Sequence, residues 1–287
     1  MHPLLLGLGI STSAARGDDP VADARTAERL GYDFVSASDH PVGTHPSYGT
    51  LTLLTWIAAR TSRITVATRV LGVPFRRPAV LAKSIESLDR LSGGRVILGL
   101  GAGYSDDEIR ALGGRSHTPG EKITGLADAV QIIRGAWSEP AFTHAGEVYG
   151  VDALDLEPKP ARTIPIWLGT FGPRALGVTG HLADGWIPSL GHAPPARIPE
   201  MRERISAAAV AAGREPDAVR CVYNVPVRID PAGRSTDDEV AGPADAVVER
   251  LQEFRQLGFT GFNLMVSGPD LGAQTQAIAE DVLPALR

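Results

Sequence analysis

The sequence feature that most constrains the fold is an alternation between short apolar runs and segments of helical periodicity. It is clearest in residues 82–104, AKSIESLDRLSGGRVILGLGAGY, where apolar side chains recur every three residues over 82–91 and indicate one face of a helix. Gly93 and Gly94 end this helix, because glycine readily adopts the left-handed conformation found at helix ends. The uninterrupted apolar run of residues 96–100 is typical of a parallel strand covered on both faces.

The same alternation continues along the chain and predicts a (β/α)8 TIM barrel, because strands that alternate with helices form parallel βαβ units. Strands are expected at residues 4–10, 33–38, 63–70, 95–100, 164–169, 185–188, 219–229 and 262–266. Helices are expected at residues 20–30, 48–61, 78–91, 106–112, 121–137, 174–182, 199–212, 244–257 and 271–286. This order favours a closed barrel over an open doubly wound sheet, and the length suits one domain over residues 1–287.

Residues 138–162 interrupt the alternation after the fourth βα unit. This stretch is rich in proline, glycine and threonine, and its centre around Ala145-Gly146 has the pattern of a β-hairpin. We interpret it as an insertion within the barrel domain rather than as a domain boundary. Residues 230–242 are polar and are expected to form a mobile connection.

The composition excludes several classes of partner. The formal net charge is −5 and no basic stripe is present, which argues against nucleic acid and against an anionic membrane surface. The apolar run at residues 4–10 is too short for a signal peptide, and no segment approaches the roughly 20 apolar residues that cross a bilayer. A cytoplasmic protein is therefore expected. Cys221 is the only cysteine, so no intramolecular disulfide can form.

Motifs of several enzyme classes are missing from the sequence. It contains neither His-Glu-x-x-His nor a paired-cysteine motif, and its histidines are scattered, so no metal site is expected. It also lacks the Gly-x-Ser-x-Gly nucleophile elbow and the Gly-x-x-x-x-Gly-Lys-Ser/Thr loop that cradles nucleotide phosphates.

Glycines gather at the end of the strand over residues 95–100, where α/β proteins bind ligands. Gly99, Gly101 and Gly103 let the backbone approach a ligand closely. A Rossmann dinucleotide fingerprint and a tight turn without a ligand are the two alternative interpretations. Tyr104 occupies the sixth position of the motif, where the fingerprint has glycine, and argues against a Rossmann site.

Residues 88–104, LDRLSGGRVILGLGAGY, and residues 107–114, DEIRALGG, resemble the luciferase-like monooxygenase superfamily, in particular its branch that uses the deazaflavin coenzyme F420. The resemblance is strongest at residues 33–40, 61–114 and 156–189. It implies a (β/α)8 barrel with the coenzyme at its carboxyl face, and an F420-dependent oxidoreductase that transfers a hydride between the coenzyme and a small organic substrate. It is weak after Pro194, where substrate-selecting residues often lie, so the substrate is not identified.

Asp39 and His40 follow the second expected strand. A histidine titrates near neutral pH and can donate or accept a proton, while an aspartate can accept hydrogen bonds from a ring or orient the imidazole. An aspartate that caps the next segment and a structural histidine are the alternative. The resemblance implies that the pair lies against the deazaflavin ring, with Asp39 in coenzyme binding and His40 in catalysis, although some relatives lack the histidine.

Thr68, Arg69 and Val70 end the third expected strand. The resemblance implies that these residues bind the coenzyme through a bulge with a non-prolyl cis peptide bond, expected at Arg69-Val70, which supports the central ring from behind. The alternative is an ordinary strand end with a solvated arginine.

The resemblance places Gly101, Ala102 and Gly103 on the coenzyme side of the barrel mouth. Some F420-dependent sugar-phosphate dehydrogenases carry an acidic residue immediately after these glycines, where this chain has Tyr104. The chain also has no lysine after Lys159 to bind a phosphate. Both features argue against sugar-phosphate oxidation.

The residues Gly169, Thr170, Phe171 and Gly172 follow the fifth strand and lead into a helix. Exposed amides at a helix start, a threonine hydroxyl and the following Arg174 would form a phosphate cradle. A Gly-Pro turn into a helix is the alternative. The resemblance implies that this loop contacts the phosphate-bearing tail of the coenzyme.

Two other functions remain open at this point. The first is an FMN-dependent monooxygenase on the same fold, since reduced FMN reacts with oxygen and a deazaflavin essentially does not. The second is a non-catalytic protein that binds a flavin or serves as an interaction partner. The resemblance also implies a homodimer that packs through barrel helices, for which the apolar face of residues 51–59 could serve as the contact, although a role in the core explains that face equally well.

Overall fold

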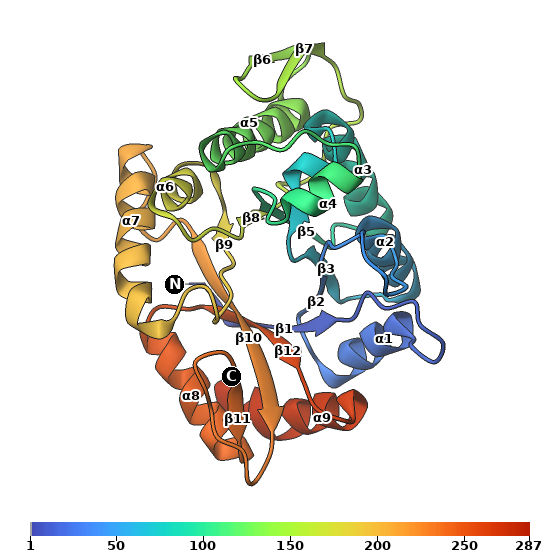
Figure 1. The fold of residues 1–287 in the computed structure, drawn as a ribbon, viewed down its shortest axis with the longest axis vertical. Helices are drawn as coiled ribbons and strands as arrows, with labels where there is room; N and C mark the ends of the chain where they lie inside the picture. Colours follow the sequence, from blue (N-terminus) through green and yellow to red (C-terminus); the bar gives the residue numbers. More distant parts are fainter. Residues whose placement is uncertain (1) are drawn as a thin grey trace.

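The computed structural model describes residues 2–287 and confirms the predicted barrel (Figure 1). The strands that form the ring are β1 (Leu5–Ile10), β2 (Phe34–Ala37), β3 (Thr65–Thr68), β5 (Val96–Gly101), β8 (Ile166–Leu168), β9 (Gly185–Trp186), β10 (Arg220–Ile229) and β12 (Gly261–Val266). Each strand pairs in parallel with its neighbour in this order, and β12 closes the ring by pairing with β1. Two short strands extend the ring, because β4 (Leu71–Gly72) pairs with β5 and β11 (Val240–Gly242) pairs with β10.

Helices surround the ring of strands (Figure 1). They are α1 (Pro20–Leu30), α2 (Thr50–Arg60), α3 (Pro78–Ser92), α4 (Asp106–Ala111), α5 (Pro119–Ser138), α6 (Pro173–Leu182), α7 (Ile198–Ala211), α8 (Ala244–Gln256), α9 (Leu271–Ala277) and α10 (Leu283–Leu286). The last expected helix, residues 271–286, is thus divided, because a π-helical turn at Ile278–Val282 separates α9 from α10.

Local signals in the sequence set the helix ends. The Asp19 carboxylate accepts hydrogen bonds from the backbone N–H groups of Val21 and Ala22, and Pro20 occupies the first turn of α1. The same helix ends at Gly31, which has a φ of 85°. These caps use backbone groups that a helix end would otherwise leave without partners.

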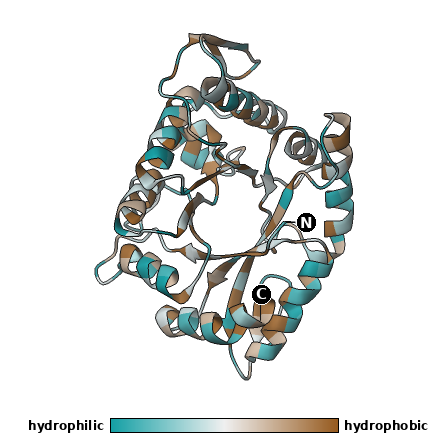
Figure 2. Ribbon diagram, turned by 180° about the vertical axis from the view of Figure 1, so that it is seen from behind, coloured by the Kyte–Doolittle hydropathy of each residue, from teal (hydrophilic) through white to brown (hydrophobic). Residues whose placement is uncertain are grey.

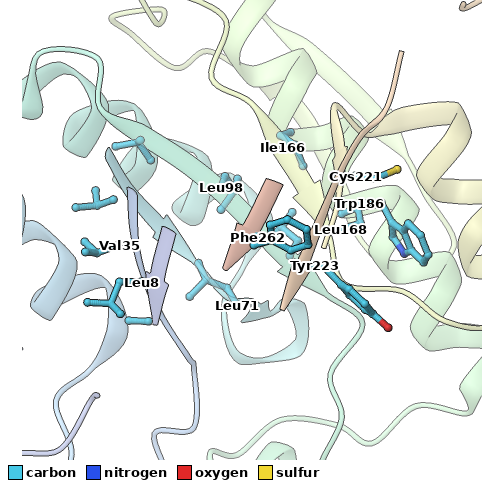
Figure 3. Close-up of a cluster of buried hydrophobic side chains, with 14 of the residues drawn as sticks. Leu8, Val35, Leu71, Leu98, Ile166, Leu168, Trp186, Cys221, Tyr223 and Phe262 are labelled. Atoms are coloured by element: carbon cyan, nitrogen blue, oxygen red, sulfur yellow. The ribbon is translucent and has the colours of Figure 1, made fainter. Parts of the chain in front are cut away.

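The hydrophobic core has two layers. Side chains that point outward from the strands pack against the helices, and Figure 3 shows part of this layer, including Leu8, Val35 and Leu98. The ring of strands is largely hydrophobic in Figure 2, whereas the helices carry hydrophilic and hydrophobic residues in alternation. This pattern is expected for parallel strands that are covered by amphipathic helices.

The second layer fills the barrel interior. It contains Phe34, Ala67, Ile97, Trp167, Ile187 and Val222. The rings of Phe34 and Trp167 meet edge to face, with 5.7 Å between their centroids and an interplanar angle of 87°. A Cβ atom at Gly7 would overlap the Phe34 ring, and one at Gly185 would overlap Trp167. The two glycines therefore make room for the two large rings of the interior.

The predicted hairpin is present outside the ring, beyond α5 (Figure 1). Its strands, β6 (Phe142–Ala145) and β7 (Gly150–Leu154), are antiparallel. The buried Asp128 of α5 anchors it by accepting hydrogen bonds from the N–H groups of Val148 and Tyr149 at 2.9 and 3.1 Å. The polar connection expected over residues 230–242 ends in a short buried strand, β11, which the sequence analysis did not predict.

The packing of the barrel interior leads to a first prediction. We expect Phe34→Ala to lower the free energy of unfolding by about 3–5 kcal/mol, because the ring is buried and the surrounding backbone cannot close the cavity. Leu91→Ala is the control, since this apolar side chain is 82% exposed and should change stability by less than about 0.5 kcal/mol. Urea denaturation followed by circular dichroism measures both. Equal effects of the two substitutions would contradict the assignment of Phe34 to the interior.

Candidate functional site

A cavity of about 510 Å³ lies at the carboxyl ends of β2, β3, β5 and β8. All the residues predicted to form the site line this cavity, except Thr68: Asp39, His40, Arg69, Val70, Gly101, Ala102, Gly103, Gly169, Thr170, Phe171 and Gly172. A larger hollow of about 1060 Å³ lies on the outer side of α1 and α2 and contains none of them. We place the site in the smaller cavity, because barrel enzymes bind their ligands at the carboxyl ends of the strands.

Thr68 lies below the cavity and joins β3 to β5. Its buried hydroxyl donates to the Gly99 carbonyl at 2.8 Å and accepts from the Gly99 N–H at 2.7 Å. A Cβ atom at Gly99 would overlap the Thr68 carbonyl oxygen, so this close contact requires glycine. Thr68 thus holds the strand end in place rather than lining the cavity.

The chain bulges directly after Thr68. Pairing between β3 and β5 ends at Ala67 and resumes when Leu71 of β4 pairs with Leu100. The Arg69–Val70 peptide bond within this bulge is cis, as the resemblance implied. The Val70 side chain lies close to two glycines, since a Cβ atom would be 2.7 Å from it at Gly101 and 3.2 Å at Gly169. The bulge and the glycine strand ends therefore form one wall.

Asp39 is buried at the end of β2 and has four hydrogen-bond donors. Arg76 donates to it twice, at 2.6 and 2.8 Å, and the Gly72 N–H and the Thr50 hydroxyl each donate at 3.0 Å. The carboxylate thus ties β2 to the segment that follows the bulge, and it does not orient His40. The sequence analysis missed Arg76, for which two consecutive arginines after a strand were the only signal.

His40 has a different carboxylate partner, Glu108 of α4. Its Nδ1 atom is 3.1 Å from Oε1 of Glu108, and its side chain is 60% exposed. Because Nδ1 is used by Glu108, Nε2 is left for a ligand. Oε2 of Glu108 is buried without a hydrogen-bond partner. The sequence analysis missed this role, although Glu108 lies in the DEIRALGG stretch of the resemblance.

The loop before α6 combines free amides with a cation. Gly172 is the N-cap residue of α6 and provides no capping side chain, so N–H groups of the first turn remain available. Arg174 donates to the Gly120 carbonyl at 2.9 Å and to the Thr124 hydroxyl at 2.7 Å, both on α5. The Thr170 hydroxyl is instead paired with that of Thr179 at 2.7 Å. Backbone and arginine, rather than threonine, therefore suit this end of the cavity to an anion.

Two kinds of feature were not found in the part of the chain that the structure describes. No group of three or more histidine, cysteine, aspartate or glutamate side chains among residues 2–287 is placed to hold a metal ion. No helix within those residues combines the length and apolarity that a membrane crossing requires.

Comparison with known proteins extends these observations. The chain is 32% identical over 241 residues to the F420-dependent glucose-6-phosphate dehydrogenase of Nakamurella multipartita, covering 80% of this chain and 70% of that protein. It is 33% identical over 217 residues to the F420-dependent hydroxymycolic acid dehydrogenase of Mycobacterium tuberculosis, covering 74% and 59% of the two chains.

Solved structures show the same fold. An F420-dependent secondary alcohol dehydrogenase in complex with an F420-acetone adduct has a TM-score of 0.90 at 20% identity, with complete coverage of both chains. A monooxygenase from Streptomyces bottropensis has a TM-score of 0.84 at 18% identity, covering 98% of this chain and 99% of that one. The family of luciferase-like monooxygenases matches residues 6–241. This match, which covers most of the barrel, shows that the chain belongs to the luciferase-like monooxygenase family.

Proposed function

We propose that this protein is an F420-dependent oxidoreductase that transfers a hydride between the deazaflavin coenzyme and a small organic substrate. The observation that carries the proposal is that the bulge, the glycine strand ends and the His40–Glu108 pair meet at one cavity of the barrel mouth. Relatives with more than 30% identity that are named F420-dependent dehydrogenases support it.

The residues of the cavity fit such a coenzyme. Its volume is within the range of about 300–1,000 Å³ that is usual for small-molecule sites. Val70 packs closely on Gly101 and Gly169, and these three residues line the cavity together and would give a ring an apolar wall. The uncapped start of α6 and Arg174 would hold a negatively charged tail.

When bound, the deazaflavin would supply hydride transfer at its central ring carbon, which amino-acid side chains cannot do. The chain itself would orient the reactants and move a proton. His40 would hold or deliver that proton at Nε2, and Glu108 would stabilise the imidazolium through Nδ1. Asp39 and Arg76 would keep the strand end that carries His40 in position. The ring of Phe171 at the cavity would help to exclude water.

The substrate differs, in this proposal, from the sugar phosphate of the glucose-6-phosphate dehydrogenases. Tyr104 lines the cavity and is 86% exposed, at the position where the resemblance implies an acidic residue in such enzymes. No lysine is among the described residues that line the cavity, and Lys122 on α5 forms an ion pair with Asp106 at 2.9 Å. We further propose a cytoplasmic location, supported by the single, buried Cys221 in a chain that can form no internal disulfide.

The first test is a coenzyme titration of the purified protein. We expect F420 to quench tryptophan fluorescence with an affinity at least about tenfold higher than that of FMN, which corresponds to about 1.4 kcal/mol of binding free energy. The opposite order would favour the FMN-dependent monooxygenase. If neither coenzyme bound, the non-catalytic alternative would replace the proposal.

A second test concerns the proton partner. We expect His40→Asn to lower kcat by about 10²-fold or more while F420 affinity stays within about threefold, because the imidazole acts on the substrate's proton. Glu108→Gln should lower kcat by a smaller factor, and Glu108→Asp should restore part of the loss. The assay follows coenzyme absorbance with the first substrate found among small alcohols, aldehydes and enones.

His181→Asn is the matched control for these variants, because His181 lies in the last turn of α6 and does not line the cavity. Its kcat should equal that of the unaltered protein. A His40→Asn variant with normal kcat, or one that has lost F420 binding instead, would show that His40 is not the proton partner.

We also propose a homodimer that packs through the outer face of α2. Most apolar residues of the 51–59 segment belong to the core, including Leu54 and Ile57, but Trp56 points outward and is 54% exposed. Together with Tyr48 it lines the large hollow beside α1, which supports a role in binding a second copy of the chain.

Sedimentation equilibrium tests this contact. The unaltered protein should have twice the 30.3 kDa mass of one chain, and Trp56→Glu should yield the single-chain mass because a buried charge opposes association. Val210→Glu is the control, since this exposed apolar residue lies on α7, away from α2 (Figure 1). A monomeric unaltered protein would refute the proposed dimer.

A further inference from the structure

Arg69 points into the barrel rather than out to solvent. Nη1 of Arg69 is 3.0 Å from the sulfur of Met265 on β12, although β1 and β2 separate β12 from β3 in the ring. The guanidinium therefore reaches across the top of the barrel interior and lines the cavity from below.

The guanidinium of Arg69 has no anionic partner among residues 2–287, since none of their carboxylates lies within 4.0 Å of its nitrogens. Its one hydrogen bond is to a thioether, which is a weak acceptor, and its buried Nε atom has no partner. Burial lowers the pKa of Arg69 to about 10, so the group is charged at neutral pH. A desolvated cation without a counterion destabilises a fold.

The other arginines near the mouth have partners of their own, since Arg174 donates to neutral groups of α5 at the coenzyme end of the cavity. Arg76 binds Asp39, and Arg228 at the end of β10 lies 2.8 Å from Asp230 and 3.6 Å from Glu239. The barrel interior also offers Arg69 no counterion, since it holds the apolar cluster of Phe34 and Trp167 and the neutral pair in which the Ser36 hydroxyl donates to Asn263 at 2.8 Å. The positively charged guanidinium of Arg69 is therefore available to bind an anionic ligand.

We propose that the side chain of Arg69 binds a carboxylate of the substrate, so that the substrate is a small organic acid. This inference rests on the proposed function. A planar guanidinium with free donors matches one carboxylate in a two-point contact. A phosphate dianion fits less well, because the other arginine of the cavity without a carboxylate partner, Arg174, is directed to α5, whereas Arg69 is directed to Met265 on β12.

This role is separate from coenzyme binding. The expected contribution of residues 69–70 to the coenzyme comes from the backbone of the bulge and from Val70, which faces Gly101 and Gly169. The Arg69 side chain extends in another direction, toward Met265. A carboxylate on the guanidinium would thus lie toward the barrel axis, while the coenzyme lay toward β5 and β8.

The test uses benzoate and its neutral analogue benzamide as probes, titrated by calorimetry with and without F420. We expect the unaltered protein to prefer benzoate by at least about tenfold and Arg69→Met to lose that preference, since one charge-assisted two-point contact accounts for it. Arg69→Lys should keep part of the preference. Arg228→Met is the matched control and should keep all of it, because Arg228 is already paired.

Thermal unfolding separates this role from a structural one. Removal of an unpaired buried charge should leave the melting temperature of Arg69→Met unchanged or higher. A fall of more than about 5 °C would assign Arg69 to the fold and overturn the proposal. Unchanged benzoate binding in Arg69→Met would also overturn the proposal. If this variant bound F420 more weakly but benzoate normally, the coenzyme would be the partner of the guanidinium, and the proposal would be overturned as well.

Failure of the proposed function has a different signature. In that case F420 would not bind, but the titration of benzoate into the free protein would still show whether Arg69 selects a carboxylate.

Discussion

The double hydrogen bond between Thr68 and Gly99 is the contact on which the geometry of the site depends. The Thr68 hydroxyl forms hydrogen bonds with both the N–H and the carbonyl of Gly99. In a regular parallel ladder these two groups would pair with the backbone of β3 instead. The strand must leave β5 there, and the bulge follows. The same departure carries Val70 to the glycine strand ends and leaves Arg69 directed into the barrel.

A buried carboxylate makes this arrangement rigid. Asp39 joins the end of β2 to Gly72 and Arg76, which lie beyond the bulge, so two neighbouring strand ends move as one unit. The next residue, His40, points outward to Glu108 on α4. Asp39 is thus fixed in the structure by four hydrogen bonds, whereas His40 keeps its Nε2 atom available for a ligand.

Much of the fold could be predicted from the sequence, because strand and helix periodicity are local properties. The barrel, the hairpin and the Arg69–Val70 cis peptide follow from such patterns or from the resemblance. Glu108 and Arg76 could not be predicted, since their partners are 68 and 37 residues away and no periodicity records such pairs. The short strand β11 was missed for a related reason, because β10 supplies its pairing and its own segment is polar.

Positive charge is found at two separate places around the cavity. Two arginines face it without a carboxylate partner among residues 2–287: Arg174, toward α5 and α6, and Arg69, toward the barrel axis. Like charges placed apart in a partly desolvated cavity attract anions to separate positions. An anionic coenzyme tail and an anionic substrate would therefore bind without competing for one cation, and Val70, Gly101 and Gly169 line the same cavity as the two arginines. The apolar middle of the cavity would then be the place where the reacting atoms meet.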